Sequence, residues 1–258
     1  NGSAPSSDAC WLYAPGTPIT ITTTTVLRAG AFKPDHQDSV ISTESYIFLD
    51  DVLLQPNDQS ARGMPAQWIT ASGTTRTADY ELDPQIVNDA AYSGMIMDGL
   101  LDLPALSLGM DNDDLFDQFT GIYANPRGRG FDWERPVSAE FFDSAGTESF
   151  RINAGIRIHG EIARSPTNNP KYPLRLVFRN EYGPGRLEYP LFANSHIERF
   201  DTLTLRAHYG SSWISGSANA DYIRNPFLME TFVDTGHPAA HSRLTHLYLN
   251  GVYWGIYE

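Results

Sequence analysis

One hairpin signal constrains the fold more than any other feature of the sequence. Residues 243–258, RLTHLYLNGVYWGIYE, are two runs rich in apolar and aromatic residues on either side of Asn250-Gly251. Asn-Gly favours the type I′ turn, which joins neighbouring antiparallel strands. The sequence therefore predicts an antiparallel hairpin here. Because the second run continues to Glu258, we expect the sequence to stop inside a domain.

Other segments with strand character precede this hairpin, and turn residues separate them. They cover residues 18–31, 39–49, 133–160, 155–179 and 200–209. Helices are predicted near 85–101 and over 220–238, where Ile223, Phe227 and Phe232 lie near one face and Gly236 with Pro238 ends the helix. Residues 103–126 predict a strand, an Asp-rich turn and a helix start with Asp111 or Asn112 as the N-cap. We therefore predict an α+β fold that is mostly β.

Composition excludes several classes of protein. The chain has 258 residues, of which 41% are hydrophobic, so it can bury a core. Its formal charge of −13 repels nucleic acid and anionic membranes. The sequence has neither an apolar run of about 18 residues nor a basic-then-apolar leader. Cys10 is the single cysteine, which excludes an intrachain disulfide, and we expect it to be a buried thiol.

Other clusters offer weaker interpretations. Four aspartates between residues 111 and 117 invite a calcium site, but Leu115 and Phe116 stand where an EF-hand needs an oxygen ligand and a glycine, so a capping turn is favoured. His237 and His241 have the spacing of helical zinc ligands, but Pro238 follows the first, and we expect no zinc there. The sequence has no Gly-x-Ser-x-Gly motif that would support a hydrolase triad.

Residues 103–258 resemble the spore coat protein H (CotH) kinase-like family. The resemblance is carried, in order, by LPALSLGMDNDDLFDQFTGIYANP, WERPVSAEF, INAGIRIHGEIARSP, PKYPLRLVFRNEYGPGRLEYPLF, FDTLTLRA and LYLNGVYWGIYE. Residues 1–49, including PITITTTTVLRAGAFKP, resemble the end of the small β-sandwich found at the C-terminus of chitobiase and β-hexosaminidase chains. This second resemblance is shorter.

The resemblances imply three parts. Residues 1–50 would be the C-terminal part of a chitobiase-like β-sandwich, residues 51–102 a linker with a short helix, and residues 103–258 the N-terminal part of a CotH kinase-like domain. That part would be an N-lobe, an antiparallel sheet with one main helix. The catalytic and magnesium-binding aspartates would lie beyond Glu258, in the C-lobe of the same polypeptide. The resemblance also implies an exported protein, extracellular or at the cell surface.

The resemblance implies ATP and Mg²⁺ as cofactors and a protein substrate. In kinases a lysine on an N-lobe strand binds the nucleotide phosphates, and a helix acid holds that lysine. Lys171, which would open the second strand of 155–179, is the candidate lysine, and Glu230 is the candidate acid. The loop from Gly160 to Asn169 would cover the phosphates. Arg164 could bind an oxyanion there or anchor a local turn.

The sequence departs from the family pattern at positions that bear on this chemistry. Glu161 and Ala163 stand where the family loop commonly has glycine and Ser or Thr, and Glu161 would place negative charge near the phosphates. Tyr172 replaces one of two lysines that commonly open the second strand. The first hypothesis is therefore a nucleotide-binding part of a secreted kinase, inactive by itself. The alternative is a structural or adhesive module on a degenerate kinase scaffold, and a carbohydrate-active enzyme is a third, weaker hypothesis.

Overall fold

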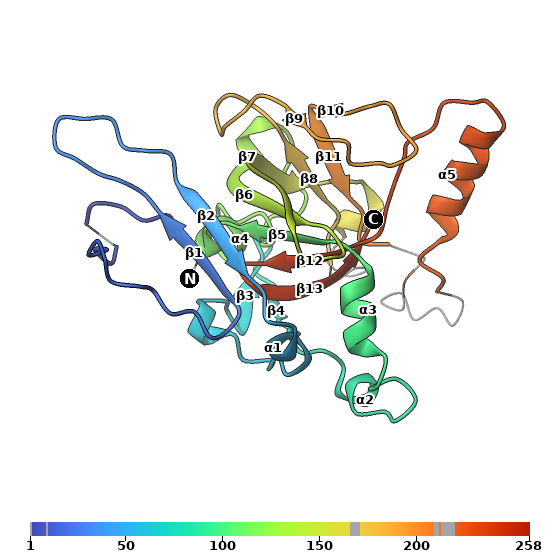
Figure 1. Cartoon of the computed structure of the whole chain (residues 1–258), viewed down its shortest axis with the longest axis horizontal. Coiled ribbons are helices and arrows are strands. Elements are labelled where there is room, and N and C mark those ends of the chain that lie inside the picture. The colour runs from blue at the N-terminus through green and yellow to red at the C-terminus, as the bar shows by residue number, and fades with distance from the viewer. Residues whose placement is uncertain (1, 9, 166–170, 209–211, 213–219) are drawn as a thin grey trace.

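The computed structural model describes residues 2–8, 10–165, 171–208, 212 and 220–258. A seven-stranded sheet forms the centre of the molecule, with short helices and hairpins around it (Figure 1). Its strand order is β11-β8-β7-β6-β5-β12-β13. The bounds are β5 Ala105–Gly109, β6 Arg135–Phe142, β7 Glu148–Ile158, β8 Leu174–Val177, β11 Thr202–Leu205, β12 Thr245–Leu249 and β13 Val252–Tyr257.

Neighbouring strands of this sheet are antiparallel, except that β12 lies parallel to β5. The predicted hairpin of 243–258 is confirmed as β12 and β13, and both turn residues have positive φ, 52° at Asn250 and 78° at Gly251. The predicted pair of strands in 133–160 is confirmed as β6 and β7.

The sheet curls until its two edges meet. Arg206 follows β11 and Glu258 follows β13, and their backbones exchange two hydrogen bonds of 2.7 and 3.0 Å. Alternate side chains of each strand then point into the curl, such as Leu106 and Leu108 of β5 and Ile156 and Ile158 of β7, all at most 3% exposed. The main hydrophobic core therefore lies inside the curled sheet.

Aromatic side chains fill one end of this core. The Tyr123 ring lies 5.1 Å from Tyr172 and 5.6 Å from Trp254, measured between ring centroids. The Trp254 indole N–H donates a 2.8 Å hydrogen bond to the Tyr123 hydroxyl, so these two polar atoms are paired inside the apolar cluster.

The N-terminal strands β1 (Thr25–Ala29) and β2 (Ser42–Tyr46) form a two-stranded hairpin. It packs on the outer face of the sheet, where Thr43 donates a 2.8 Å hydrogen bond to Ser138 and Ser45 donates through both N and Oγ to Glu140. The Glu140 side chain is only 1% exposed. The hairpin by itself does not show the predicted β-sandwich fragment.

The segment predicted as a linker, 51–102, is packed against the sheet. Met64, Ala78 and Tyr80 join the main core, and Gln55 donates a hydrogen bond of 3.2 Å to the Tyr253 carbonyl. The Pro, Gly and Asn residues of this segment shape short turns that lie on the core. Its elements are α1 Leu49–Leu53, η1 Ser60–Arg62, β3 Gln67–Ile69, β4 Thr75–Thr77, α2 Pro84–Val87 and α3 Ile96–Asp102.

Short helices and turns connect the remaining strands. Helix α5, the predicted helix of 220–238, lies at the periphery (Figure 1), and Ile223, Phe227 and Phe232 are each more than half exposed.

Cys10 is exposed, which corrects the predicted buried thiol. No helix among the described residues has the length and apolar composition needed to cross a membrane. The bounds are α4 Asn112–Phe116, η2 Phe131–Trp133, η3 Ile162–Arg164, β9 Leu187–Glu188, β10 Arg199–Phe200 and α5 Arg224–Asp234.

Candidate functional site

The predicted phosphate-facing hairpin is formed by β7 and β8. The β7 strand ends at Ile158, and His159 N donates a 2.8 Å hydrogen bond to Pro173 O, so the pairing continues past the strand ends. Gly160 has φ +89°, a left-handed conformation that favours glycine. Residues 166–170 of the loop lie outside the described residues. Strand β8 begins at Leu174, so the prediction that Lys171 starts this strand is wrong: Lys171 lies three residues before it.

Lys171 reaches across to the backbone of β13. Its ammonium donates a hydrogen bond to Trp254 O, and burial lowers the pKa of Lys171 to about 8, an effect that the charge of Asp79 partly opposes. Gly255, with φ +111°, makes room for this contact, because a Cβ there would lie 2.6 Å from Lys171 Nζ. The site therefore holds a largely protonated cation at neutral pH.

Glu230 lies on α5, in different surroundings. Its carboxylate Oε1 is 3.7 Å from His241 Nδ1. The charge of Asp79, which follows β4, raises the pKa of Lys171, although burial has the larger effect. Among the described contacts, Lys171 thus bonds to Trp254 and Glu230 lies beside His241.

Arg164 is buried, with 4% exposure, at the end of the 3₁₀ turn η3. Its guanidinium donates hydrogen bonds to four backbone carbonyls, at 2.5, 3.2, 2.6 and 2.8 Å. The acceptors are Gly160, Pro126, Gly128 and Ile158. Because a guanidinium has five N–H donors, this geometry favours the turn-anchoring interpretation over an oxyanion ligand.

The structure shows the contacts of two of the three residues that depart from the family pattern, Glu161 and Tyr172. Glu161 forms an exposed ion pair with Arg129, which balances its negative charge. Tyr172 is 3% exposed within the aromatic cluster, where burial raises its pKa to about 12, and its carbonyl accepts a 3.2 Å hydrogen bond from Tyr257 Oη. A tyrosine at 172 thus completes the core at the place where the family commonly has a second lysine.

The sequence interpretation missed a group of cations on the outer face of β7 and β8. Arg157 and Arg175 are paired across these strands, and Arg175 Nη2 donates a 3.2 Å hydrogen bond to His159 Nε2. Burial, followed by the charges of Arg175, Arg164 and Arg157, lowers the pKa of His159 to about 4, so this histidine is neutral at physiological pH. The sequence could have revealed this group, because residues alternate between the two faces of a strand in RIH (157–159) and LRL (174–176).

The aspartate-rich turn is a helix cap, as favoured from the sequence. Asp111 is the N-cap of α4 and accepts a 3.0 Å hydrogen bond from Asp113 N. Asp117 accepts hydrogen bonds from the backbone of Phe119 and Thr120, and these bonds lower its pKa. The described residues contain no group of three or more side chains suited to hold a metal ion.

All four residues predicted to bind the nucleotide lie in a segment that matches a known family. Residues 156–258 match the family model described as CotH kinase protein. This CotH match covers the last three residues of β7, strands β8 and β11, helix α5 and the β12–β13 hairpin. It supports the resemblance for this part of the chain, as a kinase-like domain. No curated protein and no solved structure matches the chain.

Proposed function

We propose that this protein binds the phosphates of ATP through the CotH-like segment, as part of an exported protein kinase, and that Lys171 is the phosphate-binding cation. The observation that carries the proposal is the placement of the Lys171 ammonium, held by Trp254 O above a glycine within the matched segment. A protonated lysine gives charge-assisted hydrogen bonds to phosphate oxygens. An approaching phosphate would also raise the lowered pKa of Lys171 and favour its charged form.

We further propose that Asp79 takes the part expected for Glu230. Its charge acts on Lys171, whereas the Glu230 carboxylate lies beside His241. The acid in such a pair orients the lysine and favours its protonated form, and this requires proximity to the lysine. Mg²⁺ would neutralise the phosphates further, but no group of three ligands for it occurs among the described residues.

Calorimetry with Mg-ATP on the full-length protein tests this assignment. A hydrogen bond to a charged group contributes about 1.5–3 kcal/mol, so we expect Lys171→Met to weaken binding by about 10- to 100-fold. Asp79→Asn should weaken it several-fold, and the matched control Glu230→Gln should leave it unchanged. Equal affinity of Lys171→Met and wild type would remove Lys171 from the site. If Glu230→Gln weakens Mg-ATP binding and Asp79→Asn does not, Glu230 is the acid that holds Lys171.

Two observations favour the second candidate, a structural or adhesive module on a degenerate kinase scaffold. Arg164 is committed to backbone carbonyls, and Tyr172 is buried where the family commonly has a lysine. This candidate predicts no heat of binding with Mg-ATP and no ATP-dependent phosphorylation of protein by the full-length chain. Measurable binding that depends on Lys171 would exclude it.

A further inference from the structure

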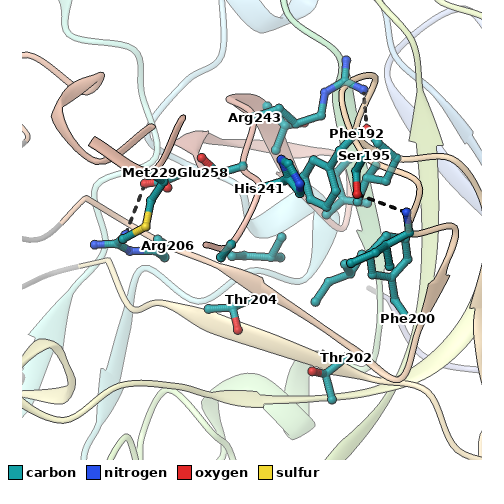
Figure 2. A pocket seen from close by; sticks show the side chains of 18 of the residues that line it. Phe192, Ser195, Phe200, Thr202, Thr204, Arg206, Met229, His241, Arg243 and Glu258 are labelled. Atoms are coloured by element: carbon teal, nitrogen blue, oxygen red, sulfur yellow. Dashed lines mark hydrogen bonds and ion pairs between the residues drawn. The ribbon is translucent and has the colours of Figure 1, made fainter. Parts of the chain in front are cut away.

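A mostly apolar cavity of about 420 Å³ opens between the curled sheet and the segment that leads from α5 to β12 (Figure 2). Figure 2 shows Arg206, Glu258 and Met229 on one side of the hollow and Phe192 and Phe200 on the other. Its volume is in the range of small-molecule sites, about 300–1,000 Å³. Lys171 is not among its lining residues, so the cavity is separate from the proposed phosphate site.

Glu258 is a buried carboxylate in the lining of this cavity. Its side chain is only 2% exposed, and its Oε1 accepts a hydrogen bond from Asn225 of α5. Its Oε2 is 3.6 Å from Arg206 Nη1, an ion-pair distance, but it has no hydrogen-bond partner among the described residues. A buried carboxylate oxygen without a donor lowers stability by about 1–3 kcal/mol or more, so this oxygen requires an explanation.

Two more buried polar atoms line the same cavity without a hydrogen-bond partner in the described part of the chain. They are His241 Nδ1 and Ser242 Oγ, just before β12. Three such atoms around one apolar hollow are typical of a site whose polar groups are satisfied by a bound molecule.

We propose that this cavity binds a small ring-bearing molecule that donates an uncharged N–H or O–H hydrogen bond to Glu258 Oε2. The aromatic and aliphatic walls favour a flat apolar body. Because Arg206 already balances the charge of Glu258, Oε2 of this carboxylate lacks a hydrogen-bond donor and not a second cation. A phosphate or carboxylate ligand is disfavoured, because it would place a second negative charge beside a buried one.

Indole and 1-methylindole test the proposal, because they share the ring system and differ in the N–H donor. We expect isothermal titration of the protein to show indole binding at least about tenfold more tightly, since the donor meets a charged acceptor. In methyl NMR spectra indole should shift the Met229 signal, and the signal of Met95, an exposed residue on the segment before α3, should stay unchanged. Glu258→Gln should reduce the preference for indole, and Glu258→Leu should abolish or reverse it.

Equal or tighter binding of 1-methylindole to the wild-type protein would overturn the role of Glu258, and this measurement requires no variant. Absence of binding by both probes would overturn the site itself. Met229→Trp, which fills the hollow, should abolish binding of both probes. If both probes bind this variant as they bind wild type, the binding occurs elsewhere and the proposal fails.

Discussion

Replacing Arg164 with methionine separates the two roles considered for this side chain, because they predict different losses. The guanidinium makes four hydrogen bonds to carbonyls, and at about 1.5 kcal/mol each, the low end for a charged donor, they sum to about 6 kcal/mol. The Gly160 carbonyl lies on a partly exposed loop, so water can replace that bond and recover about 1.5 kcal/mol. Methionine keeps much of the apolar stem. We therefore expect Arg164→Met to lower the free energy of unfolding by about 4–5 kcal/mol.

Urea denaturation followed by tryptophan fluorescence measures this loss, since Trp254 lies in the core. The matched control is Arg129→Met, which removes an arginine 58% exposed from an ion pair with Glu161, itself 76% exposed. Exposed pairs contribute little, so we expect the control to stay within about 0.5 kcal/mol of wild type. If Arg164→Met also stays within about 0.5 kcal/mol but loses Mg-ATP affinity, Arg164 is a phosphate ligand and the turn-anchoring argument is refuted.

Three further predictions test the fold around the site. Because the pKa of Lys171 is lowered to about 8 from 10.5, the unfolded chain binds this proton more tightly than the folded chain between about pH 8 and 10.5. Wild type should therefore gain roughly 3 kcal/mol of stability over Lys171→Met as the pH rises through that window, measured by urea unfolding at both ends. A stability difference that does not change with pH would contradict this. Gly251→Ala, at φ 78°, should lower stability by about 1–2 kcal/mol, whereas the Gly94→Ala control, with no atom near its added Cβ, should stay within about 0.5 kcal/mol in the same assay. Glu140→Ala should loosen the β1–β2 hairpin and speed hydrogen exchange at Ser45 N, and unchanged exchange there would show that other contacts hold the hairpin.

The strands and their turns were predictable from local chemistry. Asn250-Gly251 sets a turn through backbone preference alone, and Asp111 caps α4 through a bond to a residue two positions away. Such features depend on neighbours in the sequence. The sequence also placed Gly160 and Arg164 in one loop, but it left open whether Arg164 binds an anion or anchors a turn. That choice depends on carbonyls of Pro126 and Gly128, which are distant in the sequence.

Sequence patterns say least where packing between distant segments decides. Residues 51–102 contain many turn formers, and nothing local shows that Met64 and Tyr80 enter the core of a sheet formed by later residues. The expected pairing of Lys171 with Glu230 relied on the usual place of an acid on a helix. The charge of Asp79, from the segment interpreted as a linker, raises the pKa of Lys171 and partly opposes the effect of burial.

Charge balance within the β7–β8 hairpin decides which residues can bind a phosphate. Residues 155–179 carry five Lys and Arg but one acidic residue, in a chain whose formal charge is −13. Glu134 balances Arg157 and Arg179 at 3.4 and 3.0 Å, and four carbonyls occupy Arg164. Arg175 donates to the neutral His159, and no ion pair of Arg175 occurs in the described part of the chain. If a phosphate is bound on this outer face, Arg175 is therefore the arginine that would contact it, so Arg175→Met should weaken Mg-ATP binding while Arg179→Met, its counterpart paired with Glu134, should not.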